Sequence, residues 1–210
     1  MKKRAQSIDN RVLSRIYGSG MGSVCTPAHF QDLGSPTGVR LALMRHARAG
    51  IIRRLTRGVY DYPRRDPQLG LLSPSVDAVV RALTFRHGIR SQPSGGYAAN
   101  LLGLSEQVPM RIVFLTDGRN RRIQVGKLQI ILKRTAPRNM ATAGKISGLV
   151  IQALRHLGPR HVDEKVIMKL RRRLSPRDKR QLMADLRHAP AWVAAVMRGI
   201  AQPQFGSVVR

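Results

Sequence analysis

The chain is poor in cysteine, aromatic residues and acidic residues, and each shortage excludes a class of protein. Cys25 is the only cysteine among 210 residues, so an internal disulfide and a cluster of thiolate metal ligands are both excluded. Aromatic residues make up 4% of the chain, so the core has to be built from aliphatic side chains. The 11 acidic residues are not grouped in a way that would hold the metal ions of a nuclease.

Long hydrophobic runs are also missing. No stretch approaches the roughly 18 apolar residues of a membrane span. The start, MKKRAQSIDN, has no apolar segment after its positive charges, as a secretory signal would have. We therefore expect a cytoplasmic protein, free or bound to the nucleoid, with no membrane partner.

What the sequence has in excess is positive charge. Lys and Arg number 38 and the formal net charge is +27. The excess is spread along the chain, with 13 basic and 4 acidic residues over 1–70, 11 and 3 over 71–140, and 14 and 4 over 141–210. Because Lys and Arg release counterions when they bind a phosphate backbone, such a chain favours polyanions. Nucleic acid is the favoured partner, while an acidic protein or an anionic surface is the alternative that composition leaves open.

The first 63 residues follow the pattern of a winged helix-turn-helix. Apolar residues at helical spacing predict a first helix over 6–17. Thr26-Pro27 and Ser35-Pro36 each place a capping residue before a proline, which is typical of helix starts. A short second helix and a third helix over 36–49 are therefore expected, because two capped helices with a tight turn between them form a helix-turn-helix.

A β-hairpin, the wing, is expected directly after the third helix. Gly50 is the expected left-handed residue that ends the helix. Ile51 and Ile52 then open a strand, and Arg57-Gly58 forms the turn. Arg54 interrupts the alternation of this strand, so we expect either a bulge there or an inward arginine with a partner.

The third predicted helix and the hairpin carry the residues that could contact DNA. An α-helix fits the major groove, where Arg reads guanine, and Lys and Arg hold phosphates. The alternative is that these arginines form a solvated face; we favour DNA binding because they fall on the two elements that would touch it. The candidates are Thr37, Arg40, Met44, Arg45 and Arg48 on the helix, Arg53, Arg54 and Arg57 on the hairpin, and Lys2, Lys3 and Arg4 as a basic arm.

The rest of the chain is expected to form a linker over 64–73 and a second domain over 74–210. The second domain should contain strands over 110–134 and several helices after them. Asp117-Gly118 predicts a hairpin turn between two of the strands. The predicted class is thus α+β, a winged helix-turn-helix followed by a mixed domain with a small antiparallel sheet and several helices.

No catalytic site is expected in this sequence. The histidines are scattered without the spacing of a metal site. Ser94 and Cys25 are the candidate nucleophiles, and neither lies in a recognisable nucleophile elbow. We therefore expect no enzyme, no metal and no cofactor.

One further basic run lies in a predicted helix of the second domain. Its two interpretations are a solvated basic face and a second surface for a polyanion or an acidic partner. The residues concerned are Lys169, Arg171, Arg172 and Arg173.

Three segments, taken in order, resemble one family. They are GVRLALMRHARAGIIRRLTRGVYDYP, then SQPSGGYAANLLGLSEQVPMRIVFLTDG, then RIQVGKLQIILKR. Together they resemble the AbiEi-type antitoxins of type IV toxin–antitoxin systems, also described as AbiEi-domain transcriptional regulators, over about residues 5–160. The winged-helix segment is shared with many regulators, whereas the Pro-Ser-Gly and Ala-Ala-Asn-Leu-Leu-Gly-Leu-Ser segment joined to Thr-Asp-Gly is more specific. His46 stands where this helix pattern usually has leucine.

This resemblance implies a function for each domain. The winged helix would bind inverted repeats in its own promoter and repress it, through Thr37, Arg40, Arg45, Arg53 and Arg57. The second domain, with its signature from Pro93 to Ser105, would counteract a nucleotidyltransferase-like toxin without a stable complex. Its high charge suggests that it also touches RNA or the operator. The alternative function is a structural or assembly protein that binds DNA or RNA without sequence preference.

Overall fold

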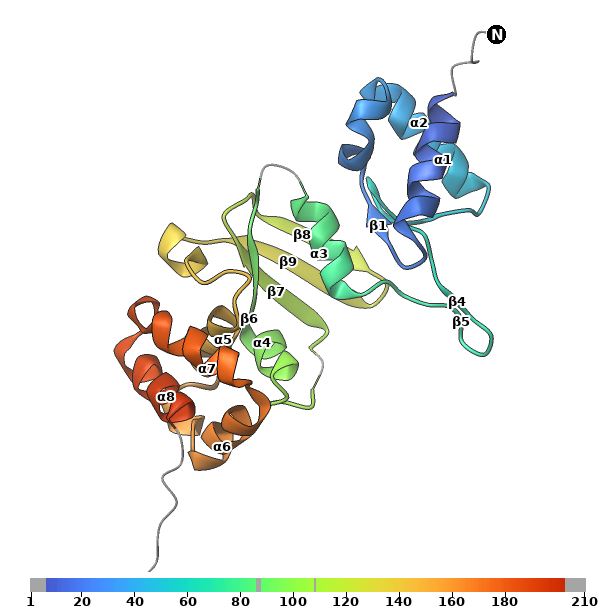
Figure 1. The fold of residues 1–210 in the computed structure, drawn as a ribbon. Coiled ribbons are helices and arrows are strands. Elements are labelled where there is room, and N and C mark those ends of the chain that lie inside the picture. The colour runs from blue at the N-terminus through green and yellow to red at the C-terminus, as the bar shows by residue number, and fades with distance from the viewer. Residues whose placement is uncertain (1–6, 86–87, 108, 203–210) are drawn as a thin grey trace, which may run out of the picture. The chain divides into compact units, whose positions relative to one another are not determined.

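The computed structural model describes residues 7–85, 88–107 and 109–202 (Figure 1). By the contacts among its residues the chain forms two compact units, Met1–Ile89 with Ile123–Lys127, and Arg90–Arg122 with Leu128–Arg210. The α+β class predicted from the sequence is confirmed. The expected basic arm, Lys2, Lys3 and Arg4, lies outside the described residues.

The first unit opens with the predicted winged helix-turn-helix. Its strands form an antiparallel sheet in the order β1-β3-β2, and α1 and α2 pack against each other. The three helices and the hairpin follow in the expected order, whereas the short strand between the first two helices was not predicted and the second helix is a 3-10 helix. Its elements are α1 (Ile8–Ser19), β1 (Val24–Cys25), the 3-10 helix η1 (Pro27–Leu33), α2 (Pro36–Arg48), β2 (Arg53–Thr56) and β3 (Val59–Asp61).

Local sequence signals account for these elements. The Ser35 hydroxyl accepts the backbone N–H of Gly38 at 3.1 Å and caps α2, with Pro36 in its first turn. After the helix, Gly50 adopts a positive φ of 72°, which only glycine does at little cost. The core beneath is aliphatic with two aromatic rings, and its buried members include Val12, Ile16, Phe30, Val39, Leu43, Ile52 and Tyr60.

Two residues that depart from the expected pattern are explained by their contacts. His46 is buried, and its Nε2 lies 3.1 Å from the backbone oxygen of Asp9. The imidazole therefore has a hydrogen-bond partner at a position where leucine was expected. The register of β2 against β3 shifts between Arg54 and Thr56, which confirms the expected bulge. Arg54 itself is exposed, and the arginine that turns inward is its neighbour Arg53.

The segment expected to be a linker contains a short hairpin. Its strands are β4 (Arg65–Asp66) and β5 (Gly70–Leu71). The Asp66 carboxylate accepts the backbone N–H groups of Gln68 and Leu69, both at 2.9 Å, which fixes the turn. Helix α3 (Val76–Thr84) follows and begins at its cap, Ser75.

The second unit joins most of a sheet to a group of helices, while the end of one strand of this sheet, from Ile123, is counted with the first unit. The helices after the sheet agree with those predicted from the sequence. The elements from here on are β6 (Ser91–Ser94), α4 (Gly95–Leu101), β7 (Arg111–Thr116), β8 (Arg121–Val125), β9 (Leu128–Arg134), η2 (Pro137–Met140), α5 (Ile146–Leu157), η3 (Pro159–His161), α6 (Glu164–Arg173), α7 (Pro176–Ala184), η4 (Leu186–His188) and α8 (Ala191–Ala201).

The sheet corrects one prediction, because it is mixed rather than antiparallel. Its strand order is β6-β7-β9-β8; β7 pairs antiparallel with β6 and parallel with β9. Asp117-Gly118 is therefore not a hairpin turn, since the next strand along the chain lies beyond β9. Instead, the Asp117 carboxylate accepts the backbone N–H of Arg90 at 2.8 Å and its Nε at 2.9 Å, which ties the end of β7 to the start of β6.

Helix α5 is the centre of the helical part of this unit. Its residues Val150, Ala153 and Leu154 have no exposed surface, and α4, α6, α7 and α8 contribute side chains to the same core. The buried Asp185 after α7 accepts hydrogen bonds from the Ser147 hydroxyl at 2.5 Å and the Gln181 amide at 2.7 Å. Burial raises the pKa of Asp185, but these hydrogen bonds and Lys145 outweigh burial and lower it.

Candidate nucleic-acid interface

The exposed face of α2 brings together most of the predicted helix candidates. Thr37, Arg40, Met44 and Arg48 follow one another at intervals of three or four residues and are all exposed. The Arg40 Nε donates to the Pro36 backbone oxygen at 3.1 Å, within the same helix. Arg48 makes no hydrogen bond or ion pair with any residue that the structure describes. The face thus presents two arginines that are not bound to a carboxylate.

Leu41 belongs to the same face and was missed by the sequence reasoning. It is 43% exposed, and Met44, three residues later, is 38% exposed. Exposed apolar side chains on a groove-facing helix suit contact with thymine methyl groups. The signal was present in the spacing, because Leu41 lies four residues after Thr37 and three before Met44.

Arg45 is partly engaged inside the protein. Its Nη1 lies 2.9 Å from the Asp9 Oδ2, and its side chain is 65% exposed. This pair connects α2 to the start of α1. An exposed ion pair contributes little stability, so little free energy is needed to release Arg45 from Asp9.

Arg53, in contrast, is a structural residue of the wing. Its Nε and Nη2 donate to the two carboxylate oxygens of Asp61 at 3.1 and 2.6 Å, and Nη2 also donates to the Leu72 backbone oxygen at 2.8 Å. The Asp61 side chain has no exposed surface. The hydrogen bond with Asp61 raises the pKa of Arg53 against the effect of burial. Because a buried carboxylate without its partner is costly, Asp61 holds this guanidinium in the wing.

The other two wing arginines are available. Arg54 and Arg57 are exposed, and neither has a hydrogen bond or ion pair among residues 7–85, 88–107 and 109–202. Arg57 lies in the turn before Gly58, whose φ is 74°. The hairpin therefore offers two cations that no described residue binds, Arg54 within β2 and Arg57 in the turn.

Hydrogen bonds fix the helices that present this face. The Arg15 guanidinium binds both oxygens of Asp32 at 2.6 and 2.7 Å and the His29 backbone oxygen at 2.8 Å, which joins α1 to η1. The hydrogen bond from Arg15 lowers the pKa of Asp32. Burial lowers the pKa of His29, whose Nδ1 accepts the backbone N–H of Thr26 at 3.2 Å.

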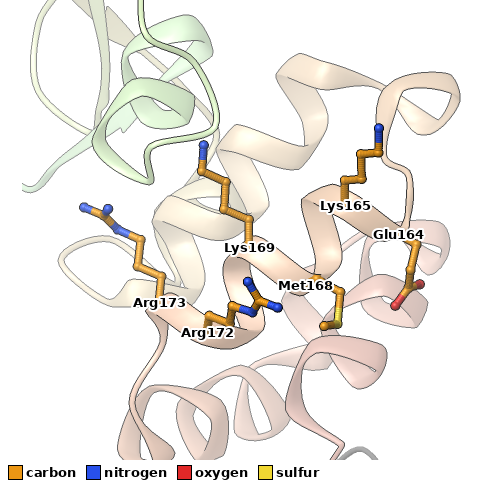
Figure 2. A pocket seen from close by; sticks show the side chains of 6 residues that line it. All are labelled: Glu164, Lys165, Met168, Lys169, Arg172 and Arg173. Carbon is orange, nitrogen blue, oxygen red and sulfur yellow. The ribbon is translucent and has the colours of Figure 1, made fainter.

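Only some of the basic side chains of α6 lie on a common surface. A hollow of about 630 Å³ lies along α6, where Lys165 and Lys169 point to the same side (Figure 2). Arg171 faces the other way, since its Nη2 donates to the Gly199 backbone oxygen at 2.6 Å. The predicted second polyanion surface therefore lacks Arg171 and gains Lys165. Its lining residues are Glu164, Lys165, Met168, Lys169, Arg172 and Arg173.

Metal ligands and a reactive thiol were also sought among the described residues. In that part of the chain, no three or more His, Cys, Asp or Glu residues lie together as a metal site would require. Burial, with a smaller effect of Asp61, raises the pKa of Cys25 to about 12, so its thiol is protonated at neutral pH. None of the described helices is long and apolar enough to cross a membrane.

The first unit thus contains a winged helix in which α2 presents an arginine-bearing face. A second unit of mixed sheet and helices follows. The chain belongs to the family described as "Family of unknown function (DUF6088)", whose model matches residues 11–182. The match spans most of the chain. No curated protein matches it.

Proposed function

We propose that this protein is a sequence-specific DNA-binding transcriptional repressor. The observation that carries the proposal is the exposed face of α2, where Arg40 and Arg48 flank the apolar pair Leu41 and Met44. Helix α2 would enter the major groove and read bases, while Arg54 and Arg57 on the hairpin would hold the flanking backbone. Arg45 would join the contacts by exchanging Asp9 for a phosphate.

We further propose that the repressor is the antitoxin of a type IV toxin–antitoxin system. The support is the resemblance of the segments from Gly38 to Pro63 and from Ser91 to Gly118 to AbiEi-type antitoxins. The operator would then be inverted repeats in the protein's own promoter, and no catalytic activity is needed. The second unit would counteract a nucleotidyltransferase-like toxin without a stable complex.

A second candidate is a structural protein that binds DNA or RNA without sequence preference. The observation that favours it is the spread of the positive charge over all three thirds of the chain. A protein of this kind would coat nucleic acid, and the arginines of α2 would act only as part of a general cationic surface.

The first test measures binding to the protein's own upstream DNA and to random DNA of equal length, with excess random competitor. A repressor keeps its site against the competitor. The double variant Arg40→Ala/Arg48→Ala should lose about 30-fold or more in affinity for the upstream DNA, corresponding to about 2 kcal/mol for two lost contacts. Arg81→Ala, which removes an exposed cation from α3, is the control and should leave this affinity nearly unchanged.

Two results would count against the repressor. Equal binding to both DNAs that is lost to competitor would favour the coating protein. Full affinity of the double variant would remove α2 as the reading helix. If specific binding is found, rescue of growth from a neighbouring nucleotidyltransferase toxin tests the antitoxin role separately.

A further inference from the structure

The second unit contains a polar cavity that the proposed repressor role does not use. Its volume is about 330 Å³, and it lies where three segments meet: the junction of β6 and α4, the end of β9, and one face of α5. The segments contribute Ser94, then Lys133 and Arg134, then Gln152, Arg155 and His156. The α5 residues follow at intervals of three and one, so all three lie on one side of the helix.

The cavity is strongly positive. Lys133, Arg134 and Arg155 are exposed, and their side chains make no ion pair or hydrogen bond with the described residues. No Asp or Glu of the described chain is among the residues that line the cavity. Like charges from β9 and α5 beside one cavity repel one another, and a bound anion would replace this repulsion by attraction.

A buried amide gives the cavity a fixed donor. Gln152 is only 7% exposed. Its Oε1 accepts the Ser94 hydroxyl at 3.1 Å. Its Nε2 is not among the buried atoms that lack a partner in the described chain, so this N–H is reached from the cavity and can donate to a bound group.

The His156 side chain lies against the start of α4. A Cβ built on Gly96 would be 3.4 Å from the His156 Nε2, an ordinary contact distance. Ser94 and Gly96 belong to the Pro-Ser-Gly-Gly segment, Pro93 to Gly96. This segment lies outside the winged helix.

We propose that this cavity binds the phosphate group of a nucleotide, either free or at the end of a nucleic-acid strand. Cationic residues of β9 and α5 and an amide N–H at one cavity match the oxygens of a phosphate monoester, which Arg binds with its planar fork. The volume lies at the lower end of the range for small-molecule pockets, about 300 to 1,000 Å³, so the site takes one nucleotide and not a duplex. The proposal does not depend on DNA binding by the first unit.

The α6 hollow does not share these properties. Glu164 is part of its lining, and none of its lining residues is buried. Its cations suit a diffuse contact with a polyanion. The cavity at Ser94, with its buried amide, is the one built for a defined group.

Calorimetry with the full-length protein in about 150 mM salt, an ionic strength that screens diffuse charge, tests the site. The probes are AMP, adenosine, inorganic phosphate, and a short RNA with either a 5′-phosphate or a 5′-hydroxyl. AMP or the 5′-phosphorylated RNA should bind, whereas adenosine should not bind and the 5′-hydroxyl RNA should bind more weakly. AMP binding as tightly as the RNA identifies a free nucleotide as the ligand, and tighter binding of the phosphorylated RNA identifies a strand end.

The variant Lys133→Ala/Arg155→Ala should weaken this binding about tenfold or more, the effect of losing charge-assisted hydrogen bonds. Both side chains are exposed, so the fold should be kept, which circular dichroism checks. Arg160→Ala/Arg177→Ala, which removes the same charge from exposed positions outside the cavity, is the matched control. Equal losses in both variants, no binding of any phosphate-bearing probe, or equal binding of the two RNAs would overturn the proposal.

Discussion

The arginines of the winged helix fall into two groups according to whether a carboxylate is within reach. Arg15 and Arg53 each bind an aspartate through two hydrogen bonds. Arg48 and Arg57 have no such partner in the described part of the chain. With 38 basic residues for 11 acidic ones, most arginines must remain unpaired. The arginines that bind an aspartate through two hydrogen bonds therefore hold the fold together, and the others remain for an external anion.

Arg53 is the residue at which this division can be tested. Arg53→Ala leaves the Asp61 carboxylate buried without its partner, so the free energy of unfolding should fall by about 3 kcal/mol. Asp61→Ala should cost less, because the Arg53 side chain is 33% exposed and can reach water. Urea unfolding of the two variants measures both effects. Unchanged stability of Arg53→Ala together with weaker DNA binding would make Arg53 a contact residue instead.

At the level of elements, α5 shows how one glycine sets the distance between a helix and its neighbours. A Cβ built on Gly148 would lie 2.3 Å from the Thr142 backbone oxygen and 2.6 Å from the Gln92 Oε1. The Gln92 Oε1 also accepts the backbone N–H of Gly144 at 3.2 Å. The start of α5 is thus packed directly onto Gln92 of β6 and the loop before the helix, and β6 and α5 carry Ser94 and Gln152, respectively.

Two glycine substitutions should consequently have opposite effects. Gly148→Ala should lower the free energy of unfolding by about 1 to 3 kcal/mol, because the backbone oxygen of Thr142 cannot move aside easily. Gly199→Ala in α8, where a Cβ meets nothing within 4 Å, should raise it by about 0.5 to 1 kcal/mol through helix propensity. Thermal unfolding of both variants measures the sign. Two changes of the same sign would contradict the close approach at Gly148.

At the scale of the whole molecule, the charge of +27 gives a background affinity for any polyanion. The charges occur in both compact units, on elements as different as the hairpin tip at Arg57 and helix α6 at Lys169. Such binding depends on counterion release and carries no sequence information. Specific reading by α2 would have to be measured above this background.

Affinity for random duplex DNA should therefore fall by about a factor of 10³ or more between 50 and 200 mM salt. The Arg40→Ala/Arg48→Ala variant should keep most of this non-specific affinity, since it removes two of many cations. Fluorescence anisotropy over a salt series measures both slopes. A shallow salt dependence in the unmodified protein would show that few of its cations reach the phosphate backbone.

Much of the winged helix could be predicted because its signals are local. Ser35 caps α2 by binding the Gly38 N–H three residues away, and Gly50 takes its positive φ directly after the helix. The bulge at Arg54 is also visible in the alternation of its own strand. Such features depend on a few neighbouring residues, so periodicity and capping rules identify them.

The sequence by itself thus determined the order of the helices, the hairpin, and the excess of cations on them. The tertiary structure decided which cations are bound: Arg53 by Asp61, Arg171 by Gly199, while Lys133 and Arg155 stay free beside Ser94. It also decided that β7 pairs in parallel with β9. The Asp117-Gly118 pair had wrongly predicted a hairpin between β7 and the next strand along the chain. The physical reason is that these outcomes depend on residues far apart in the chain, whose meeting no local pattern encodes.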